Sequence, residues 1–305
     1  MSWQPAQDAV CSSPADCPPV ETVIVPKTHD VGGFDVKRAL PSSRRRMIGP
    51  FIFFDQMGPA TLPQGKGMDV RPHPHIGLST VTWLIEGEIM HRDSVGSVQA
   101  IRPGEVNWMT AGAGIAHSER TPDALRPGGP SLYGIQTWLA LPKTHEETAP
   151  RFEHFKADAL PRIEGDGIKA TLIAGTGWGK RSPVGVFTET LYADMRLADG
   201  ATLTIPTEHE ERGLYVLTGA VQIAGERFEP GVMLAFRPGQ PIDVTAEGAT
   251  HLMVLGGARA DGPRHIWWNF VSSSAERIEQ AKADWKAGRF AKVTGDDEFI
   301  PLPEN

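Results

Sequence analysis

Residues 71–97 read RPHPHIGLSTVTWLIEGEIMHRDSVGS, and residues 103–119 read PGEVNWMTAGAGIAHSE. Within the first stretch, Ser79–Ile85 alternates roughly between polar and apolar residues, which is typical of a strand with one buried face. The chain then bends at Gly87, and a Pro-Gly turn opens the second stretch. Short strands separated by Gly and Pro turns are typical of a β-sandwich or a closed barrel. We therefore predict an all-β fold.

A similar pattern returns in the second half of the chain. Residues 213–219 (GLYVLTG) resemble residues 80–87 (TVTWLIEG), and a second Pro-Gly turn follows. The 305 residues are enough for about two domains, so we predict two similar barrels in tandem. The expected divisions are a flexible tail over residues 1–20, a first barrel over 21–150 and a second barrel, with a terminal helix, over 151–305.

The predicted helix lies near the end of the chain. Ser273 followed by Glu276 reads as a capping box at its start. Ile278, Ala281 and Trp285 then share one helical face. We expect this face to pack against a barrel.

Composition and charge argue against several functions. The net charge is −7, and the only basic run, Arg44–Arg46, reads as a solvated loop rather than a surface for phosphate backbones. The first twenty residues lack the basic start and apolar core of a signal peptide, and no apolar run approaches the ~18 residues of a membrane span. Cys11 and Cys17 could form a disulfide, but in a flexible tail they are interpreted as free thiols. We expect a cytoplasmic protein that binds neither nucleic acid directly nor a membrane.

Two pairs of candidate metal ligands flank the predicted hairpin, at His73-Pro74-His75 and at His117-Ser118-Glu119. Residues two apart on a strand point to the same face, so each pair can direct two ligands into a barrel. Three neutral imidazoles and a carboxylate suit a divalent first-row metal. The sequence therefore predicts one metal site built from these four side chains.

The His-x-Glu pattern alone carries little weight, because it also occurs at His145 and at His209. Those two histidines fall in an apparent linker and in a charged cluster that reads as surface. The repeat offers an internal control, since the corresponding positions of the second half are neutral or apolar: Ile205, Thr207, Val244 and Ala246. We therefore expect one metal per chain, in the first barrel.

The two quoted stretches closely resemble the pirin family of the cupin superfamily, as do residues 49–55 (GPFIFFD) and 269–290 (NFVSSSAERIEQAKADWKAGRF). The resemblance covers nearly all of the chain after residue 20. It implies a bicupin, in which two β-barrels face each other and only the N-terminal one holds metal. Matched motif to motif, the family's ligands fall on His73, His75, His117 and Glu119.

The resemblance also implies a cofactor and an activity. The family usually holds Fe(II), so we expect one divalent ion per chain, with Mn, Ni, Cu or Zn as alternatives. Several members have quercetin 2,3-dioxygenase activity, which makes a flavonol or similar phenolic and O₂ the expected substrates. Glu119 is then a candidate base as well as a ligand. The predicted apolar pocket residues are Phe54, Trp83, Trp108 and Met109.

Two other functions stay open. Animal pirins act as nuclear cofactors for transcription factors and some bacterial ones contact metabolic enzymes, so the chain could be a metal- and redox-dependent regulatory protein. A closed tetrahedral zinc site would instead be structural. Ile76 stands where animal pirins carry Arg, and Ser79 stands where they carry Glu, which weakens the transfer of the transcriptional role. We expect a monomer.

Overall fold

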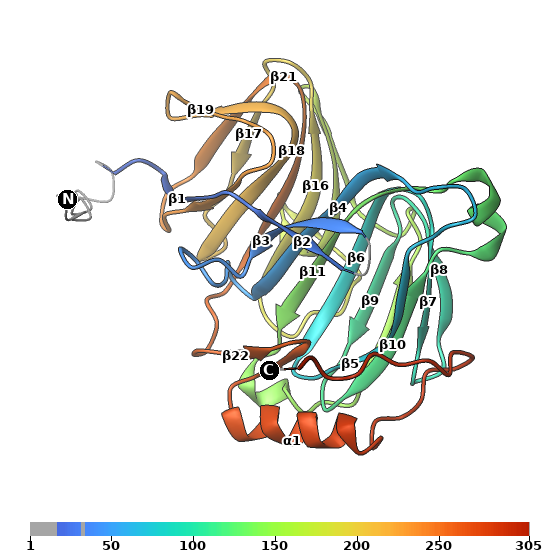
Figure 1. Ribbon diagram of the computed structural model, residues 1–305. Helices are drawn as coiled ribbons and strands as arrows, with labels where there is room; N and C mark the ends of the chain where they lie inside the picture. The colour runs from blue at the N-terminus through green and yellow to red at the C-terminus, as the bar shows by residue number, and fades with distance from the viewer. Residues whose placement is uncertain (1–16, 32–33, 305) are drawn as a thin grey trace, which may run out of the picture.

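The computed structural model describes residues 17–31 and 34–304, and these form two β-barrels that pack against each other (Figure 1). The first barrel has two facing sheets. The larger sheet has the strand order β12-β9-β6-β11-β4-β3-β2, and the smaller has the order β5-β10-β7-β8. The bounds are β2 (Lys27–Asp30), β3 (Asp35–Leu40), β4 (Phe51–Thr61), β5 (Asp69–His75), β6 (Leu78–Glu86), β7 (Ile89–Asp93), β8 (Val98–Ile101), β9 (Val106–Thr110), β10 (Ile115–Arg120), β11 (Ser131–Ala140) and β12 (Arg151–Phe155).

The second barrel is one curved sheet with the main order β1-β20-β18-β21-β16-β14-β13, and three short strands pair at its margins. Two 3₁₀ helices, η2 (Asp123–Gly128) and η3 (Lys143–His145), lie in connections of the first half. The strand bounds are β1 (Val20–Ile24), β13 (Arg162–Gly165), β14 (Ile168–Gly177), β15 (Lys180–Arg181), β16 (Thr190–Leu197), β17 (Thr202–Ile205), β18 (Glu211–Ile223), β19 (Glu226–Phe228), β20 (Met233–Phe236) and β21 (Ile242–Gly257).

The barrels exchange their boundary strands. β1 pairs with β20 of the second barrel, and β12 pairs with β9 of the first. The predicted division between residues 150 and 151 therefore separates β12 from the sheet to which it belongs. Of the tail expected over residues 1–20, residues 1–16 lie outside the part of the chain that the structure describes. Cys17 is disulfide-bonded, which corrects the prediction of a free thiol there, and Cys11 lies outside the described residues.

The C-terminal segment returns to the first barrel. The strands β22 (His265–Trp267) and β23 (Phe270–Ser272) form a hairpin, and α1 (Ala275–Lys286) follows it. Ile278 and Ala281 of α1 pack with Ile76 and Phe270, so the helix covers the first barrel as Figure 1 shows. The cap of α1 is Ser274, whose Oγ accepts a hydrogen bond from the backbone N–H of Arg277 at 3.2 Å.

The predicted cap, Ser273, lies one residue too early. Its hydroxyl and backbone N–H both donate to the carboxylate of Glu146 instead. Among the described residues, no helix is long and apolar enough to cross a membrane.

The two faces of the larger sheet have different roles. One face packs against the second barrel in a shared apolar core, in which Phe54 and Ile135 meet Tyr192 and Tyr215. The Phe54 and Tyr215 rings lie 4.9 Å apart. The opposite face turns into the first barrel, where it faces the smaller sheet. The candidate site lies on this inner side.

Candidate metal centre

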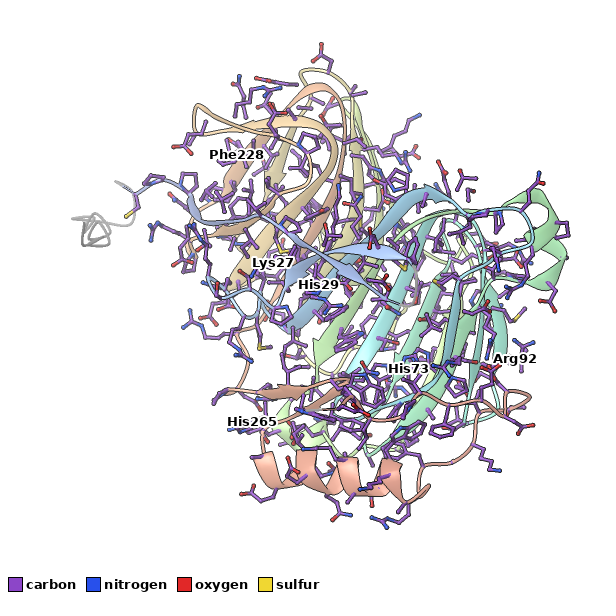
Figure 2. All side chains as sticks on the ribbon, in the orientation of Figure 1. Lys27, His29, His73, Arg92, Phe228 and His265 are labelled. Atoms are coloured by element: carbon purple, nitrogen blue, oxygen red, sulfur yellow. The ribbon has the colours of Figure 1, made fainter. Side chains whose placement is uncertain are left out.

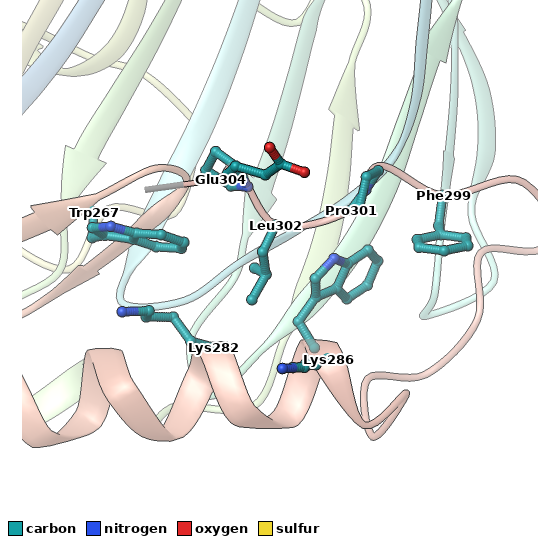
Figure 3. A pocket seen from close by; sticks show the side chains of 9 residues that line it. Trp267, Lys282, Lys286, Phe299, Pro301, Leu302 and Glu304 are labelled. Carbon is teal, nitrogen blue, oxygen red and sulfur yellow. The ribbon is translucent and has the colours of Figure 1, made fainter.

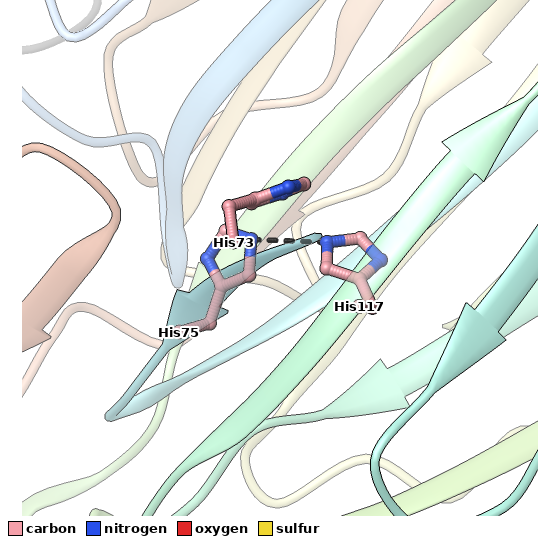
Figure 4. Close-up of side chains that lie close together, drawn as sticks. All are labelled: His73, His75 and His117. Atoms are coloured by element: carbon pink, nitrogen blue, oxygen red, sulfur yellow. Dashed lines mark hydrogen bonds between the residues drawn. The ribbon is translucent and has the colours of Figure 1, made fainter. Parts of the chain in front are cut away.

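β5 and β10 bring the predicted histidines together. His73 lies directly opposite His117 in the antiparallel pairing, and His75 lies opposite Ile115. One potential ligand atom from each of His73, His75 and His117 lies within 4.8 Å of the others (Figure 4). The Nε2 atoms of His75 and His117 are 3.1 Å apart. This is the only such group of ligand atoms in the described part of the chain.

Hydrogen bonds orient His73 and His75 toward this point. The Nδ1 of His73 lies 2.9 Å from the carbonyl oxygen of Arg71, and the Nδ1 of His75 lies 3.1 Å from that of Asn269. A carbonyl only accepts, so each Nδ1 carries the hydrogen and each neutral ring has a bare Nε2. The Nε2 lone pairs are therefore free to bind a cation.

The ring of His117 is oriented by His91, which is not one of the four predicted ligands. The Nε2 of His91 lies 2.8 Å from Oδ2 of Asp93, which only accepts, so His91 carries its hydrogen on Nε2. The Nδ1 of His91 is then an acceptor for the Nδ1–H of His117, at 3.4 Å. This arrangement leaves the Nε2 of His117 bare as well. His91 and Asp93 lie two residues apart on one strand, like His73 and His75, so the same spacing rule could have identified them from the sequence.

Burial keeps the rings of His73, His75 and His117 neutral. Loss of solvent lowers the pKa of His73, and it holds the pKa values of His75 and His117 well below the usual value for histidine. For Asp93, burial favours a higher pKa, but hydrogen bonds from His91 and Ser97 together outweigh it and lower the pKa. Three convergent neutral imidazoles with bare nitrogens fit a divalent cation.

Glu119 lies on the same face of β10 but outside the three-histidine group. Its Oε1 accepts a hydrogen bond from Thr82 Oγ1 at 3.1 Å, and its Oε2 accepts one from Gln136 Nε2 at 2.9 Å. A register shift between His117 and Glu119 interrupts the pairing with β5. The structure thus places Glu119 beside the site, and its roles as ligand and base stay predictions.

A cavity of about 910 Å³ opens onto His73 and Glu119, which is within the usual range of roughly 300–1,000 Å³ for small-molecule sites. Its wall includes Phe53 and Trp138, whose rings stack at 3.9 Å. The N-terminal strands β2 and β3 and the hairpin β22–β23 contribute to its rim. Other lining residues include Lys27, His29, Val36, Arg38, Asp55, Met57, Met68, Val70, Arg71, Gln136, Ile266, Trp268, Asn269 and Ile300.

The predicted pocket residues do not line this cavity. Phe54, Trp83 and Trp108 belong to the core between the barrels, because alternation along the strands turns them to the opposite face of the sheet. Met109 is buried in an apolar cluster with Phe53 and is not part of the cavity lining. For β4 the prediction was wrong by one residue, since Phe53 and Asp55 line the cavity on either side of Phe54.

The control positions in the second barrel offer no ligands. Ile205, Val244 and Ala246 are buried in its apolar core, and Thr207 is exposed. His209 is buried, not on the surface as predicted, and its two ring nitrogens contact Glu189 and the carbonyl of Thr176.

A separate pocket of about 450 Å³ lies between α1 and the last residues of the chain (Figure 3). The ammonium of Lys282 lies 4.5 Å from the centre of the Trp267 ring there. Its charged lining residues are Lys282, Lys286 and Glu304. None of the three clustered histidines lines this pocket, so the cavity in the first barrel is the candidate site for a metal.

Comparison with known proteins decides the family. The family model described as pirin matches residues 33–139, and the model of the pirin C-terminal cupin domain matches residues 192–291. The chain belongs to the pirin family. The predicted all-β bicupin fold, with two cupin barrels and a C-terminal helix, is thereby confirmed.

Pirin-family relatives match along almost the whole chain. A pirin-like protein of Caulobacter vibrioides is 50% identical over 289 residues, covering 93% of this chain and 100% of that protein. A putative quercetin 2,3-dioxygenase of Pseudomonas aeruginosa is 38% identical, covering 92% and 90%. The crystal structure of a quercetin 2,3-dioxygenase from Acinetobacter baumannii is similar with a TM-score of 0.86 and 35% identity, covering 93% and 95%.

Proposed function

We propose that this pirin-family member is a metal-dependent dioxygenase that opens the central ring of a flavonol or a related phenolic. The observation that carries the proposal is the convergence of three buried neutral imidazoles beside a cavity of small-molecule size. The relatives named as quercetin 2,3-dioxygenases support the choice of reaction.

His73, His75 and His117 would hold the metal, and we propose Fe(II) as the ion and Glu119 as the fourth ligand. When bound, a divalent ion of this kind lowers the pKa of a coordinated hydroxyl and brings that hydroxyl and O₂ together. The proposed reaction breaks the C2–C3 and C3–C4 bonds of the flavonol. Both atoms of O₂ enter the ester product, and C3 leaves as carbon monoxide with its own oxygen.

Glu119 is the proposed acceptor of the proton from the flavonol 3-hydroxyl. Thr82 and Gln136 each occupy one of its carboxylate oxygens, so they hold the side chain in place while lone pairs remain for the proton. Phe53 and Trp138 provide an apolar wall against which the aromatic substrate can lie.

The test is anaerobic reconstitution with Fe(II), followed by measurement of O₂ uptake and carbon monoxide release with quercetin. We expect both in the wild type and neither in His75→Ala, which loses a ligand. We expect Glu119→Gln to retain metal through the three histidines and to turn over at least about 100-fold more slowly, as expected for loss of a general base.

Full iron loading without O₂ uptake would contradict quercetin as a substrate. The regulatory alternative would then be favoured, and the next measurement would compare the affinity of the Fe(II) and Fe(III) forms for protein partners. Retention of iron in His75→Ala would contradict the assignment of the metal centre itself.

A further inference from the structure

The rim of the cavity farther from the histidines is positively charged. Lys27 of β2 lies directly opposite Arg38 of β3, and His29 lies two residues farther along β2. All three side chains line the cavity, and Figure 2 shows Lys27 and His29 on the hairpin away from His73. Within the described residues the side chain of Lys27 has no hydrogen bond or ion pair, so its ammonium is free for a ligand.

Arg38 also retains donors that face no protein acceptor. Its Nε and Nη2 donate to the two carboxylate oxygens of Asp55 at 2.9 and 2.8 Å. Nη1 has no partner among the described residues, and the arginine side chain is 26% exposed. The guanidinium is fixed, because it lies 4.4 Å from the centre of the Phe53 ring as well as pairing with Asp55. A fixed guanidinium with spare hydrogens is well suited to bind an oxyanion.

A continuous aromatic wall joins this cationic rim to the metal centre. Trp138 stacks on the Phe53 ring at 3.9 Å, and β4 lies between β3 and β11, so Arg38 and Trp138 flank Phe53 from its two sides. The Trp138 ring in turn meets His75 edge-on, with 5.2 Å between ring centres. A planar ligand that lies along this wall can reach both ends.

The charged side chains of the lining differ between the two ends of the cavity. The carboxylate of Glu119 lies at the histidine end, where as the proposed fourth ligand it would offset one of the two charges of a bound divalent ion. Asp55 is paired with Arg38, and Asp69 is paired with Arg126 at 2.7 Å. Lys27 is an unpaired cation at the rim, so the rim can bind negative charge. Arg71 adds a cation to the lining nearer the histidines, two residues before His73 on β5.

We propose that Lys27 and Arg38 bind a carboxylate, so that the substrate is a phenolic acid with its ring hydroxyls at the histidines and its carboxylate at the rim. This inference rests on the proposed function for the role of the hydroxyl end. It narrows the proposed substrate class from flavonols and related phenolics in general to phenolics that carry a carboxylate.

The test compares 3,4-dihydroxycinnamate with its primary amide, which has nearly the same shape and ring hydroxyls but no charge. Binding of each to the holoprotein is measured by calorimetry under nitrogen, so that no turnover occurs. Because charge-assisted hydrogen bonds are the stronger ones, we expect the acid to bind about ten-fold more tightly than the amide.

Variants of the rim assign this preference to residues. Lys27→Ala should remove most of the preference for the acid, because it weakens binding of the acid more than binding of the amide, and Lys27→Glu should reverse the preference. Lys37→Ala is the matched control, because Lys37 is an exposed lysine on the same hairpin that does not line the cavity. Lys27 is exposed, so these substitutions leave the core intact.

Equal affinities for acid and amide in the wild type, equal effects of Lys27→Ala and Lys37→Ala, or no binding of either compound would each overturn the inference. The quercetin assay is a separate readout. A charge preference without any O₂ uptake from quercetin would retain the rim site and reject quercetin turnover. O₂ uptake from quercetin without a preference for the acid would retain quercetin turnover and reject the rim site.

Discussion

His91 determines which nitrogen its neighbour presents to the metal centre. By accepting the Nδ1–H of His117 and donating to Asp93, it leaves the Nε2 of His117 bare. Its ring also stacks on Phe152 at 4.4 Å, which fixes its plane. An indirect contact of this kind orients a ligand without touching the metal.

The variant His91→Phe tests this role, because phenylalanine preserves the stacking and removes both hydrogen bonds. We expect metal affinity, measured by chelator competition, to fall by about 10- to 100-fold, the usual range for such partners of metal ligands. His145→Phe is the control, since His145 is exposed and lies outside the three-histidine group. An unchanged affinity in His91→Phe would show that the tautomer of His117 is fixed by other means.

Strand alternation predicted that the three histidines meet, but the same argument put Glu119 with them, and Glu119 lies outside the three-histidine group. His73 and His75 are two apart on one strand, and the structure brings them together with His117 as expected. The apolar pocket was wrong because a sequence of consecutive apolar residues, such as Phe51–Phe54, does not show which side faces the ligand. Only the packing of the second barrel settles that Phe54 points away.

At the scale of single elements, α1 depends on its cap. The Oγ of Ser274 accepts a hydrogen bond from the N–H of Arg277, one of the donors at the helix start that have no partner within the helix. Ser274→Ala should lower the free energy of unfolding by about 1 kcal/mol, and Ser274→Gly by only a few tenths. Urea denaturation of the two variants gives both values. A larger loss for glycine than for alanine would contradict the cap assignment.

Local patterns predicted the positions of strands in the first barrel, but not the strand pairing that links the two halves of the chain. The range Ser79–Ile85 lies within β6, and Ile115–Glu119 lies within β10. The exchange of β1 and β12 escaped prediction because β1 finds its partner more than 200 residues away, through β20. Local patterns carry no information about such a long-range pairing.

At the scale of the whole molecule, the two barrels share buried polar contacts as well as a core. The indole N–H of Trp83 in the first barrel donates to Oδ2 of Asp194 in the second at 2.8 Å, and His251 contacts the same oxygen at 2.9 Å. Asp194 is buried, so its carboxylate needs these two partners to replace the hydrogen bonds that water would make.

Trp83→Phe should therefore lower the free energy of unfolding by about 1–3 kcal/mol, the usual cost of removing one partner from a buried polar group. Trp178→Phe is the matched control, because the Trp178 indole also donates a hydrogen bond, to the Thr204 carbonyl, but at the surface. Chemical denaturation measures both. Equal losses in the two variants would mean that the contact between barrels adds nothing to stability.

Isotopic labelling measures whether the three-histidine cavity incorporates O₂ into a phenolic substrate, as we propose. The iron-loaded wild type is supplied with ¹⁸O₂ and quercetin, and the products are analysed by mass spectrometry. We expect an ester product with two ¹⁸O atoms, unlabelled carbon monoxide, and neither product from His75→Ala. Ring-opened product without label, or label incorporated equally by His75→Ala, would contradict the proposal.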